Sequence, residues 1–235
     1  MEQQLRLLGL DYVFTEAVEG NKLSSDEKTN ATSTLNYAFL DGEIGCALSH
    51  QAIYAKMIAD NIEQALILED DVTLPENLKN ILDSITFPSA SAAIILLSRV
   101  NKYYSKPLHE VTAGYCLHKT QQATTAHSYI INKKGAASLL AGLTPIWMTA
   151  DKWSLFEDLS MINVYAVIPH LITLSNSANA STINMKKGDA HINKKKKEIW
   201  DVLMKKRPLK AKIKHRIRRG FIPLFTQITD HGKGI

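Results

Sequence analysis

The stretch that decides the fold is Ala65-Leu-Ile-Leu-Glu-Asp-Asp-Val72, in which an apolar run leads directly into three adjacent carboxylates. A short apolar run bounded by polar residues is typical of a buried strand. The three acids cannot lie in the core, because burying unpaired like charges costs a large free energy for each charge. We therefore expect them at the rim of a sheet, where a divalent cation can hold them together.

The spacing of these acids predicts a metal–diphosphate site. Side chains alternate along a strand, so Glu69 and Asp71 share one face while Asp70 points to the other. Hard cations such as Mn²⁺ and Mg²⁺ bind carboxylate oxygens and complete their coordination with water and substrate phosphates. The alternative is that Asp70 and Asp71 only cap the helix expected after Pro75.

Composition places the chain among ordinary globular proteins. Its 235 residues suffice for one large domain or two small ones, and 45% of them are hydrophobic. The sequence has no uncharged apolar run of about 18 residues and no signal-peptide core, so we expect no transmembrane helix. Cys46 and Cys116 lie far apart without metal-ligand spacing. They predict buried thiols in a reducing compartment, and hence a cytoplasmic protein.

Apolar runs alternate with helical patterns along the chain. The patterns predict helices over about residues 1–10, 44–58, 75–85, 132–140 and 150–158, and strands over about 12–14, 65–72, 92–97, 126–131 and 165–168. A loop is expected at 21–36, and a hairpin or irregular region at 103–125. This alternation favours an α/β fold with a mainly parallel sheet flanked by helices. Ligands bind at the carboxyl ends of strands in such sheets, where the three acids lie.

The positive charge is concentrated after residue 185, although the whole chain carries only +5. There the apolar run 199–204 precedes basic residues that alternate with Leu209, Ile213, Ile217, Phe221 and Ile222. A spacing of about four predicts one apolar helical face with lysine and arginine opposite, a pattern that binds anionic membranes. We expect a domain over 1–185 and a basic amphipathic extension over 186–235. A solvated tail and nucleic-acid binding are the alternatives, and nucleic acid is not the expected partner.

Two blocks carry a resemblance to a known family. The segment Gly42-Glu-Ile-Gly-Cys-Ala-Leu-Ser-His50, followed by the acidic stretch 65–72, resembles the signature of glycosyltransferase family 25. The bacterial members of this family act in lipooligosaccharide biosynthesis. Segments 126–136, 145–151 and 169–183 resemble further family blocks more loosely, so the resemblance spans roughly residues 5 to 185.

The resemblance implies a GT-A-like nucleotide-diphospho-sugar transferase fold. It also implies transfer of a hexose, commonly galactose, from a UDP-sugar to a lipooligosaccharide or lipopolysaccharide acceptor with inversion. Mn²⁺ or Mg²⁺ would be held by Glu69 and Asp71, and the donor would contact Glu69 and Asp70. Ser49 and His50 would line the pocket, although both are also explained as ordinary helix residues.

An inverting transfer needs a base across the sugar from the diphosphate, and therefore from a different segment than the metal ligands. Asp151 is the expected base, because it aligns with the family's aspartate after a proline. It could instead cap the helix at 152–157. His127 could face the cleft from its strand, but a place at the rim or in the core is the expected one.

Family members usually begin with an apolar strand, whereas this chain begins in the helix that follows it. The alternative function is therefore a truncated, inactive relative that binds membrane or a partner. A metal-dependent phosphohydrolase is a further rival, but it usually needs a second ligand cluster. The expected partners are a UDP-sugar, a lipid-anchored glycan and an anionic membrane surface. Together they predict a peripheral protein on the inner face of the bacterial inner membrane.

Overall fold

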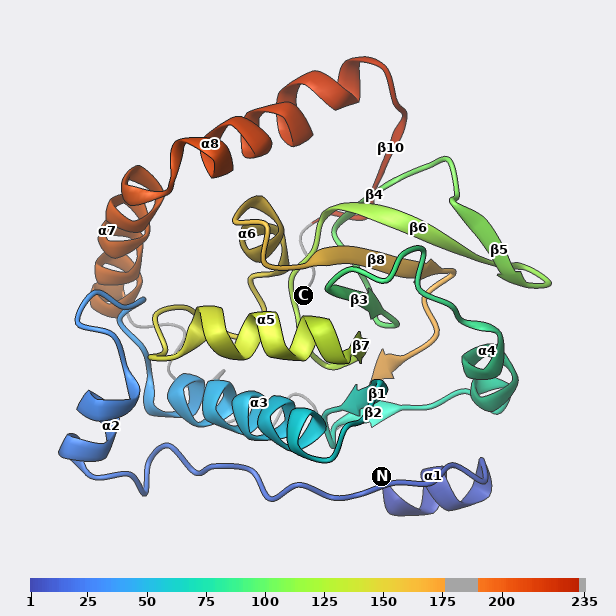
Figure 1. Ribbon diagram of the computed structural model, residues 1–235, viewed down its shortest axis with the longest axis horizontal. Coiled ribbons are helices and arrows are strands. Elements are labelled where there is room, and N and C mark those ends of the chain that lie inside the picture. The colour runs from blue at the N-terminus through green and yellow to red at the C-terminus, as the bar shows by residue number, and fades with distance from the viewer. Residues whose placement is uncertain (176–189, 233–235) are drawn as a thin grey trace.

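The computed structural model describes residues 1–175 and 190–232, and Figure 1 shows its arrangement. The helices are α1 Glu2–Leu7, α2 Ser25–Ala31, α3 Asp41–Ala59, α4 Leu78–Ser84, α5 Lys133–Leu143, α6 Trp153–Asp158, α7 Ala190–Lys206 and α8 Leu209–Arg216, followed by the π turn η3 Ile217–Phe221 and the 3-10 turn η4 Ile222–Leu224. The strands are β1 Gln64–Leu68, β2 Val72–Thr73, β3 Ala93–Leu96, β4 Lys102–Tyr104, β5 His109–Thr112, β6 Tyr115–Gln122, β7 Ser128–Asn132, β8 Asn163–Ile168, β9 Thr173–Leu174 and β10 Ile228–Asp230.

The main sheet has the strand order β1-β7-β3-β8-β6-β4-β10, with β5 paired to β6. Within the described residues only β3 and β8 pair in parallel, and the other neighbours are antiparallel. The mixed α/β class is confirmed, but the expectation of a mainly parallel sheet is wrong. An apolar run looks the same in either direction, and the region at 103–125 forms antiparallel strands joined by short turns, as at Gly114 with its positive φ of 85°.

The sheet is buried on both faces by alternate side chains of the same strands. In β3, Ile94 and Leu96 join the cluster beneath α3, α5 and α6, while Ile95 lies in the cluster with α1 and α4. All four β3 residues are buried, and each fully buried aliphatic side chain contributes about 1.5–3 kcal/mol. Helices α3 and α5 lie side by side on the first of these faces (Figure 1).

Local predictions were confirmed where a cap or apolar residues at helical spacing mark the element. Asn132 caps α5, since its side chain accepts the N–H of Gly135 at 2.8 Å. The helix expected at 44–58 is α3. Residues 12–14 do not form a strand, and the loop expected at 21–36 contains α2. That helix is started by a reciprocal capping box between Ser24 and Glu27, which outweighs the polar composition of the segment.

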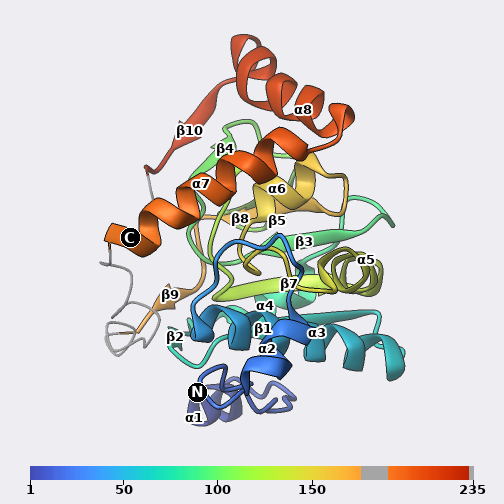
Figure 2. The same cartoon turned by 90° about the vertical axis from the view of Figure 1, so that its left-hand side faces the viewer.

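The C-terminal segment packs against the sheet domain instead of standing apart from it (Figure 2). Trp200, Leu203 and Met204 of α7 contact the core on the α3 face, and β10 adds to the sheet beside β4. The predicted boundary near residue 185 and the final family block at 181–183 lie outside the described residues.

Among the helices formed by residues 1–175 and 190–232, none combines the length and apolarity needed to cross a membrane.

Candidate active site

The register of two antiparallel strands brings Glu69 and His127 together. Leu68 at the end of β1 lies opposite Ser128 at the start of β7. The pairing continues one residue further, because the Glu69 N–H donates to the His127 carbonyl at 2.9 Å. Directly opposite residues project on one face of the sheet, and His127 Nδ1 lies 2.7 Å from Glu69 Oε2. The sequence favoured a rim or core position for His127, with a cleft-facing position as the alternative, and did not pair it with Glu69.

Asp71 joins this pair. Glu69, Asp71 and His127 each offer a ligand atom, and these atoms all lie within 4.8 Å of one another. Oδ1 of Asp71 is buried without a hydrogen-bond partner. Asp70 is exposed and lies outside the cluster as predicted, but β1 ends at Leu68, so the turn at Asp70 and Asp71 separates these side chains and not the alternation of a strand. Neither aspartate caps α4, because the N-cap residue of that helix is Asn77.

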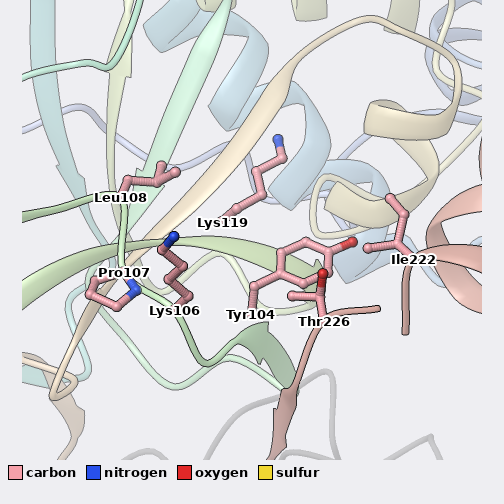
Figure 3. A pocket seen from close by; sticks show the side chains of 7 residues that line it. All are labelled: Tyr104, Lys106, Pro107, Leu108, Lys119, Ile222 and Thr226. Atoms are coloured by element: carbon pink, nitrogen blue, oxygen red, sulfur yellow. The ribbon is translucent and has the colours of Figure 1, made fainter. Parts of the chain in front are cut away.

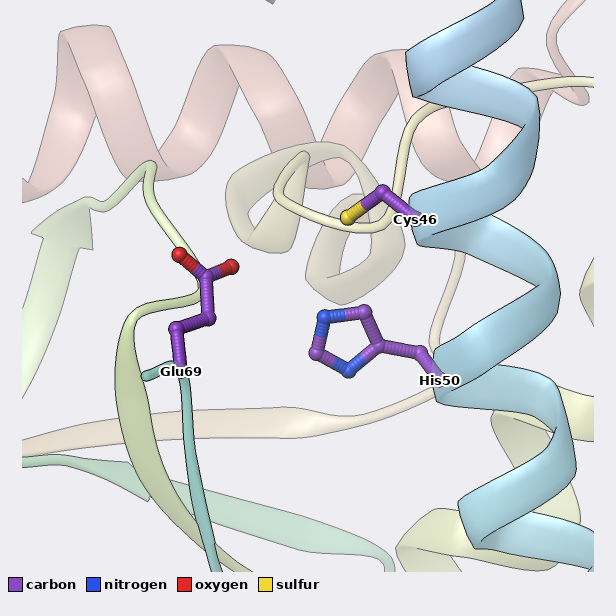
Figure 4. Close-up of side chains that lie close together, drawn as sticks. All are labelled: Cys46, His50 and Glu69. Carbon is purple, nitrogen blue, oxygen red and sulfur yellow. The ribbon is translucent and has the colours of Figure 1, made fainter. Parts of the chain in front are cut away.

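Helix α3 closes the cluster from the other side (Figure 4). Cys46 and His50 lie one turn apart and approach Glu69, with their ligand atoms and a Glu69 oxygen within 4.8 Å of one another. His50 Nδ1 is 2.7 Å from the hydroxyl of Tyr129, which leaves Nε2 as the nitrogen that faces Glu69. The Tyr129 hydroxyl also lies 2.8 Å from the hydroxyl of Tyr54, so a buried polar chain orients the His50 ring.

The electrostatics of the cluster follow from burial and these contacts. Burial alone would raise the pKa of Glu69, but the hydrogen bond and charge of His127 outweigh it and lower that pKa. The hydrogen bond to Glu69 raises the pKa of His127. Burial and then the charge of Glu69 raise the pKa of Asp71, and burial lowers the pKa of His50. The charge of Glu69 makes ionisation of Asp71 less favourable, so a bound cation would stabilise the two carboxylates.

The donor set fits a hard divalent cation. The two carboxylates suit Mn²⁺ or Mg²⁺, and the unpartnered Asp71 oxygen offers a buried lone pair, while His127 holds Glu69 through its hydrogen bond. Cys46 fits such an ion poorly, because burial raises the pKa of its thiol to about 12 and keeps it protonated. The Glu69–Asp71–His127 cluster is therefore the better candidate metal centre of the two.

Asp151 lies in the loop before α6. Its Oδ1 accepts the hydroxyl hydrogen of Thr149 at 2.7 Å and lies 3.6 Å from Lys152 Nζ. It does not cap α6, whose N-cap residue is Lys152. Its charge contributes to the raised pKa of His127, so the carboxylate lies within electrostatic reach of the cluster.

Ser49 is engaged in structure. Its Oγ accepts the N–H of Val18 at 2.9 Å and donates to the Gly45 carbonyl at 2.8 Å, so it ties the N-terminal segment to α3. The N-terminal segment and α3 approach closely there, since a Cβ on Gly45 would lie 2.2 Å from the Val18 carbonyl oxygen. The signal that could have predicted this contact is the pair of glycines, Gly20 and Gly45, which allows backbone to meet helix.

A separate cavity of about 490 Å³ lies between the sheet and the C-terminal turn, and Figure 3 shows its lining. It shares no residue with the Glu69 cluster. The lining combines two lysines and two hydroxyl-bearing residues with apolar side chains: Tyr104, Lys106, Pro107, Leu108, Lys119, Ile222 and Thr226. The sequence did not predict this cavity, because its walls come from distant segments.

Residues 1–154 match the sequence profile of the family described as "Glycosyltransferase family 25 (LPS biosynthesis protein)". The chain belongs to glycosyltransferase family 25. The family resemblance and the expectation of a glycosyltransferase are thereby confirmed at the level of the family.

Three relatives illustrate the range of this family. The chain is 42% identical over 74 residues to a "Glycosyltransferase 25 family member" of Aedes aegypti, a match that covers 28% of this chain and 12% of the relative. It is 30% identical over 131 residues to a Haemophilus influenzae protein named "Putative glycosyltransferase", covering 54% and 46%. It is 24% identical over 144 residues to human "Procollagen galactosyltransferase 2", covering 56% and 23%. The matches span less than half the length of each of these relatives.

Proposed function

We propose that this family 25 chain transfers a hexose, galactose, from a UDP-sugar to a lipid-anchored glycan of the lipooligosaccharide or lipopolysaccharide class, with inversion. Family membership supports the reaction class. The names of procollagen galactosyltransferases among the relatives support galactose as the sugar. The observation that carries the proposal is the convergence of Glu69, Asp71 and His127 at the end of β1.

In this proposal the cluster binds the diphosphate end of the donor. Glu69 and Asp71 would hold Mn²⁺ or Mg²⁺, which supplies neutralisation of the charge on the departing diphosphate. His127 holds the Glu69 carboxylate in place through its hydrogen bond. His50, kept neutral by burial, faces the same carboxylate, and Asp70 at the exposed rim contacts the outer part of the nucleotide. Ser49 shapes the pocket wall through its contact with Val18.

Asp151 is the proposed general base. It comes from a different segment than the cluster, as inversion requires, and lies within electrostatic reach of it. Thr149 and Lys152 orient the carboxylate to accept the proton of an acceptor hydroxyl. A lipid-anchored acceptor places the reaction at a membrane surface, and the basic C-terminal segment supports a peripheral position on the inner face of the bacterial inner membrane.

The test is a donor screen with the purified full chain, truncated lipooligosaccharide and Mn²⁺, read as the mass shift of the acceptor. We expect a hexose shift that is lost with Glu69→Gln and with Asp71→Asn. Asp83→Asn, an exposed carboxylate on α4, is the matched control and keeps the activity. Full activity of both cluster variants refutes the proposed site.

Calorimetry with UDP separates this proposal from an inactive relative. An active enzyme takes up UDP more tightly with Mn²⁺ than without it, and Glu69→Gln abolishes the difference. A relative that only binds membrane or a partner shows no metal-dependent uptake. Release of free sugar or phosphate without an acceptor supports the phosphohydrolase instead.

A further inference from the structure

The C-terminal segment presents an exposed apolar stripe. Leu209, Ile213, Ile217 and Phe221 follow one another at intervals of four residues, which places them along one side of α8 and η3. They are 72%, 48%, 45% and 60% exposed. The stripe continues into the next turn with two further exposed apolar residues, Leu224 and Phe225. Large apolar side chains gathered on one exposed face mark a surface that meets an apolar partner.

The opposite side of this segment is fixed to the domain. Arg218 is buried and donates from Nε to Asp158 Oδ1 at 3.0 Å and from Nη2 to Oδ2 at 2.9 Å. His215 Nδ1 lies 2.7 Å from the same Oδ2, and Ala211 is buried beneath the helix. These contacts hold the stripe outward, because residues 211, 215 and 218 lie on the side of the helix away from Leu209 and Ile213.

The apolar run 199–204 and the apolar face that begins at Leu209 have different surroundings in the structure. Trp200, Leu203 and Met204 of α7 pack onto the core and are not available to a partner. Val202 of α7 is also exposed, but the other exposed large apolar residues of the C-terminal segment lie between Leu209 and Phe225. Trp200, Leu203 and Met204 of the apolar run 199–204 therefore differ from the face that begins at Leu209, because they complete the hydrophobic cluster beneath α7.

Cations flank the stripe on both sides. Lys210 is exposed on one side of it, and Arg216 and Arg219 are exposed on the other. Apolar side chains between basic ones complement an anionic bilayer, in which the apolar groups enter the interface and the cations meet lipid phosphates. A second copy of the chain would bring two basic faces together, which like-charge repulsion disfavours.

The cavity of Figure 3 borders this surface. Ile222 follows Phe221 directly and lines the cavity together with Thr226. Lys106 and Leu108 on the opposite wall are exposed, so a cation and an apolar side chain continue the same pattern onto the sheet domain. A lipid phosphate fits such a lining better than a neutral ligand does.

We propose that the face formed by Leu209, Ile213, Ile217, Phe221, Leu224 and Phe225, with its flanking Lys210, Arg216 and Arg219, docks the protein on an anionic lipid bilayer. The inference rests on the proposed function for its purpose and deepens it, since it names the surface that meets the membrane of the acceptor. The α8–η4 face is fixed relative to the sheet by Asp158, so docking also orients the domain on the membrane.

The test is co-sedimentation of the full chain with vesicles of phosphatidylglycerol or of phosphatidylcholine. We expect binding to the anionic vesicles only. Replacing Ile213 and Ile217 together by serine removes binding, and Leu7→Ser, at an exposed apolar residue of α1, is the control that keeps it. Replacing Lys210, Arg216 and Arg219 by glutamine weakens partitioning on the order of 100-fold, at about fivefold for each charge.

Several results overturn the inference. Equal binding to both vesicle types would show that charge does not contribute to binding. Full binding by the Ile213→Ser and Ile217→Ser double variant would show that the apolar stripe does not contribute. A dimer that this double variant dissociates, without vesicle binding, identifies a second copy as the occupant. The assay contains neither donor nor acceptor, so its failure leaves the proposed transferase untouched. Conversely, Glu69→Gln binds vesicles normally even if the transferase proposal fails.

Discussion

Neutralising Asp158 tests whether a buried charge cluster holds the C-terminal segment on the domain. The Asp158 side chain is 2% exposed and that of Arg218 is 7% exposed. The carboxylate contacts Arg218 through two hydrogen bonds, pairs with His215 at 2.7 Å and lies 3.9 Å from Arg207. Asp158→Asn keeps the shape but leaves the guanidinium buried beside two basic groups. Removing one partner of a buried pair costs about 3–5 kcal/mol.

The destabilisation by Asp158→Asn can take two forms, and both are measurable. If the segment stays docked, the free energy of unfolding in urea falls by the full amount. If undocking is cheaper, residues 209–232 detach and the loss is limited to the free energy of docking. Limited digestion with trypsin detects detachment, because Lys210, Lys212 and Arg216 then become cleavable. The exposed Asp201→Asn on α7 is the matched control.

A double-mutant cycle separates the pair from its surroundings. Arg218→Met alone leaves the Asp158 carboxylate buried, whereas the double variant Asp158→Asn and Arg218→Met removes both charges and recovers part of the loss. We expect a coupling energy of about 2 kcal/mol or more. A change in stability below about 0.5 kcal/mol for Asp158→Asn, with wild-type trypsin cleavage, refutes the reasoning.

Three further predictions follow from single residues. Gly45→Ala places a Cβ 2.2 Å from a backbone carbonyl oxygen and lowers the free energy of unfolding by about 1–3 kcal/mol, which a lower melting temperature detects. Gly220→Ala, whose Cβ has nothing within 4 Å, leaves the melting temperature near that of the wild type. His170 accepts the Val100 N–H at 3.1 Å, and burial, followed by neighbouring positive charge, lowers its pKa from 6.5 to about 4, so the stability it contributes above pH 6.5 is lost as the pH falls toward 4. Urea midpoints between pH 7 and 4 measure this slope, and His170→Gln flattens it; an unchanged slope rules the residue out. Asp151→Asn reduces turnover about 10²–10⁴-fold with little change in KM, and near wild-type turnover removes it as the base.

Elements with a strong local signal could be predicted from the sequence. The helical period of α3 and the asparagine cap of α5 depend on residues within a turn or two of each other. The capping box that starts α2 was also present in the sequence, at Ser24 and Glu27, but the polar composition of the segment concealed it. Strand direction was not predictable, because β1 and β3 read alike whether their neighbours run parallel or antiparallel.

The candidate site also combines features that follow from neighbouring residues with features that depend on long-range packing. The sequence predicted that Glu69 and Asp71 converge while Asp70 stays apart, and this held although the strand ends at Leu68 and a turn carries the two aspartates. The pairing of His127 with Glu69 depends on the register of β1 against β7, which no local pattern encodes. The approach of Cys46 and His50 depends on how α3 packs over the sheet. The role of Asp151 stays a prediction.

The sequence by itself determined the family, the acidic end of β1 and the amphipathic basic character of the C-terminal segment. These properties follow from the identity and spacing of residues that are close in the chain. Only the tertiary structure decided the antiparallel sheet, the imidazole that joins the two acids and which apolar residues of the C-terminal segment remain exposed. Each of these depends on which distant surfaces bury one another, and that choice is made by packing over the whole molecule.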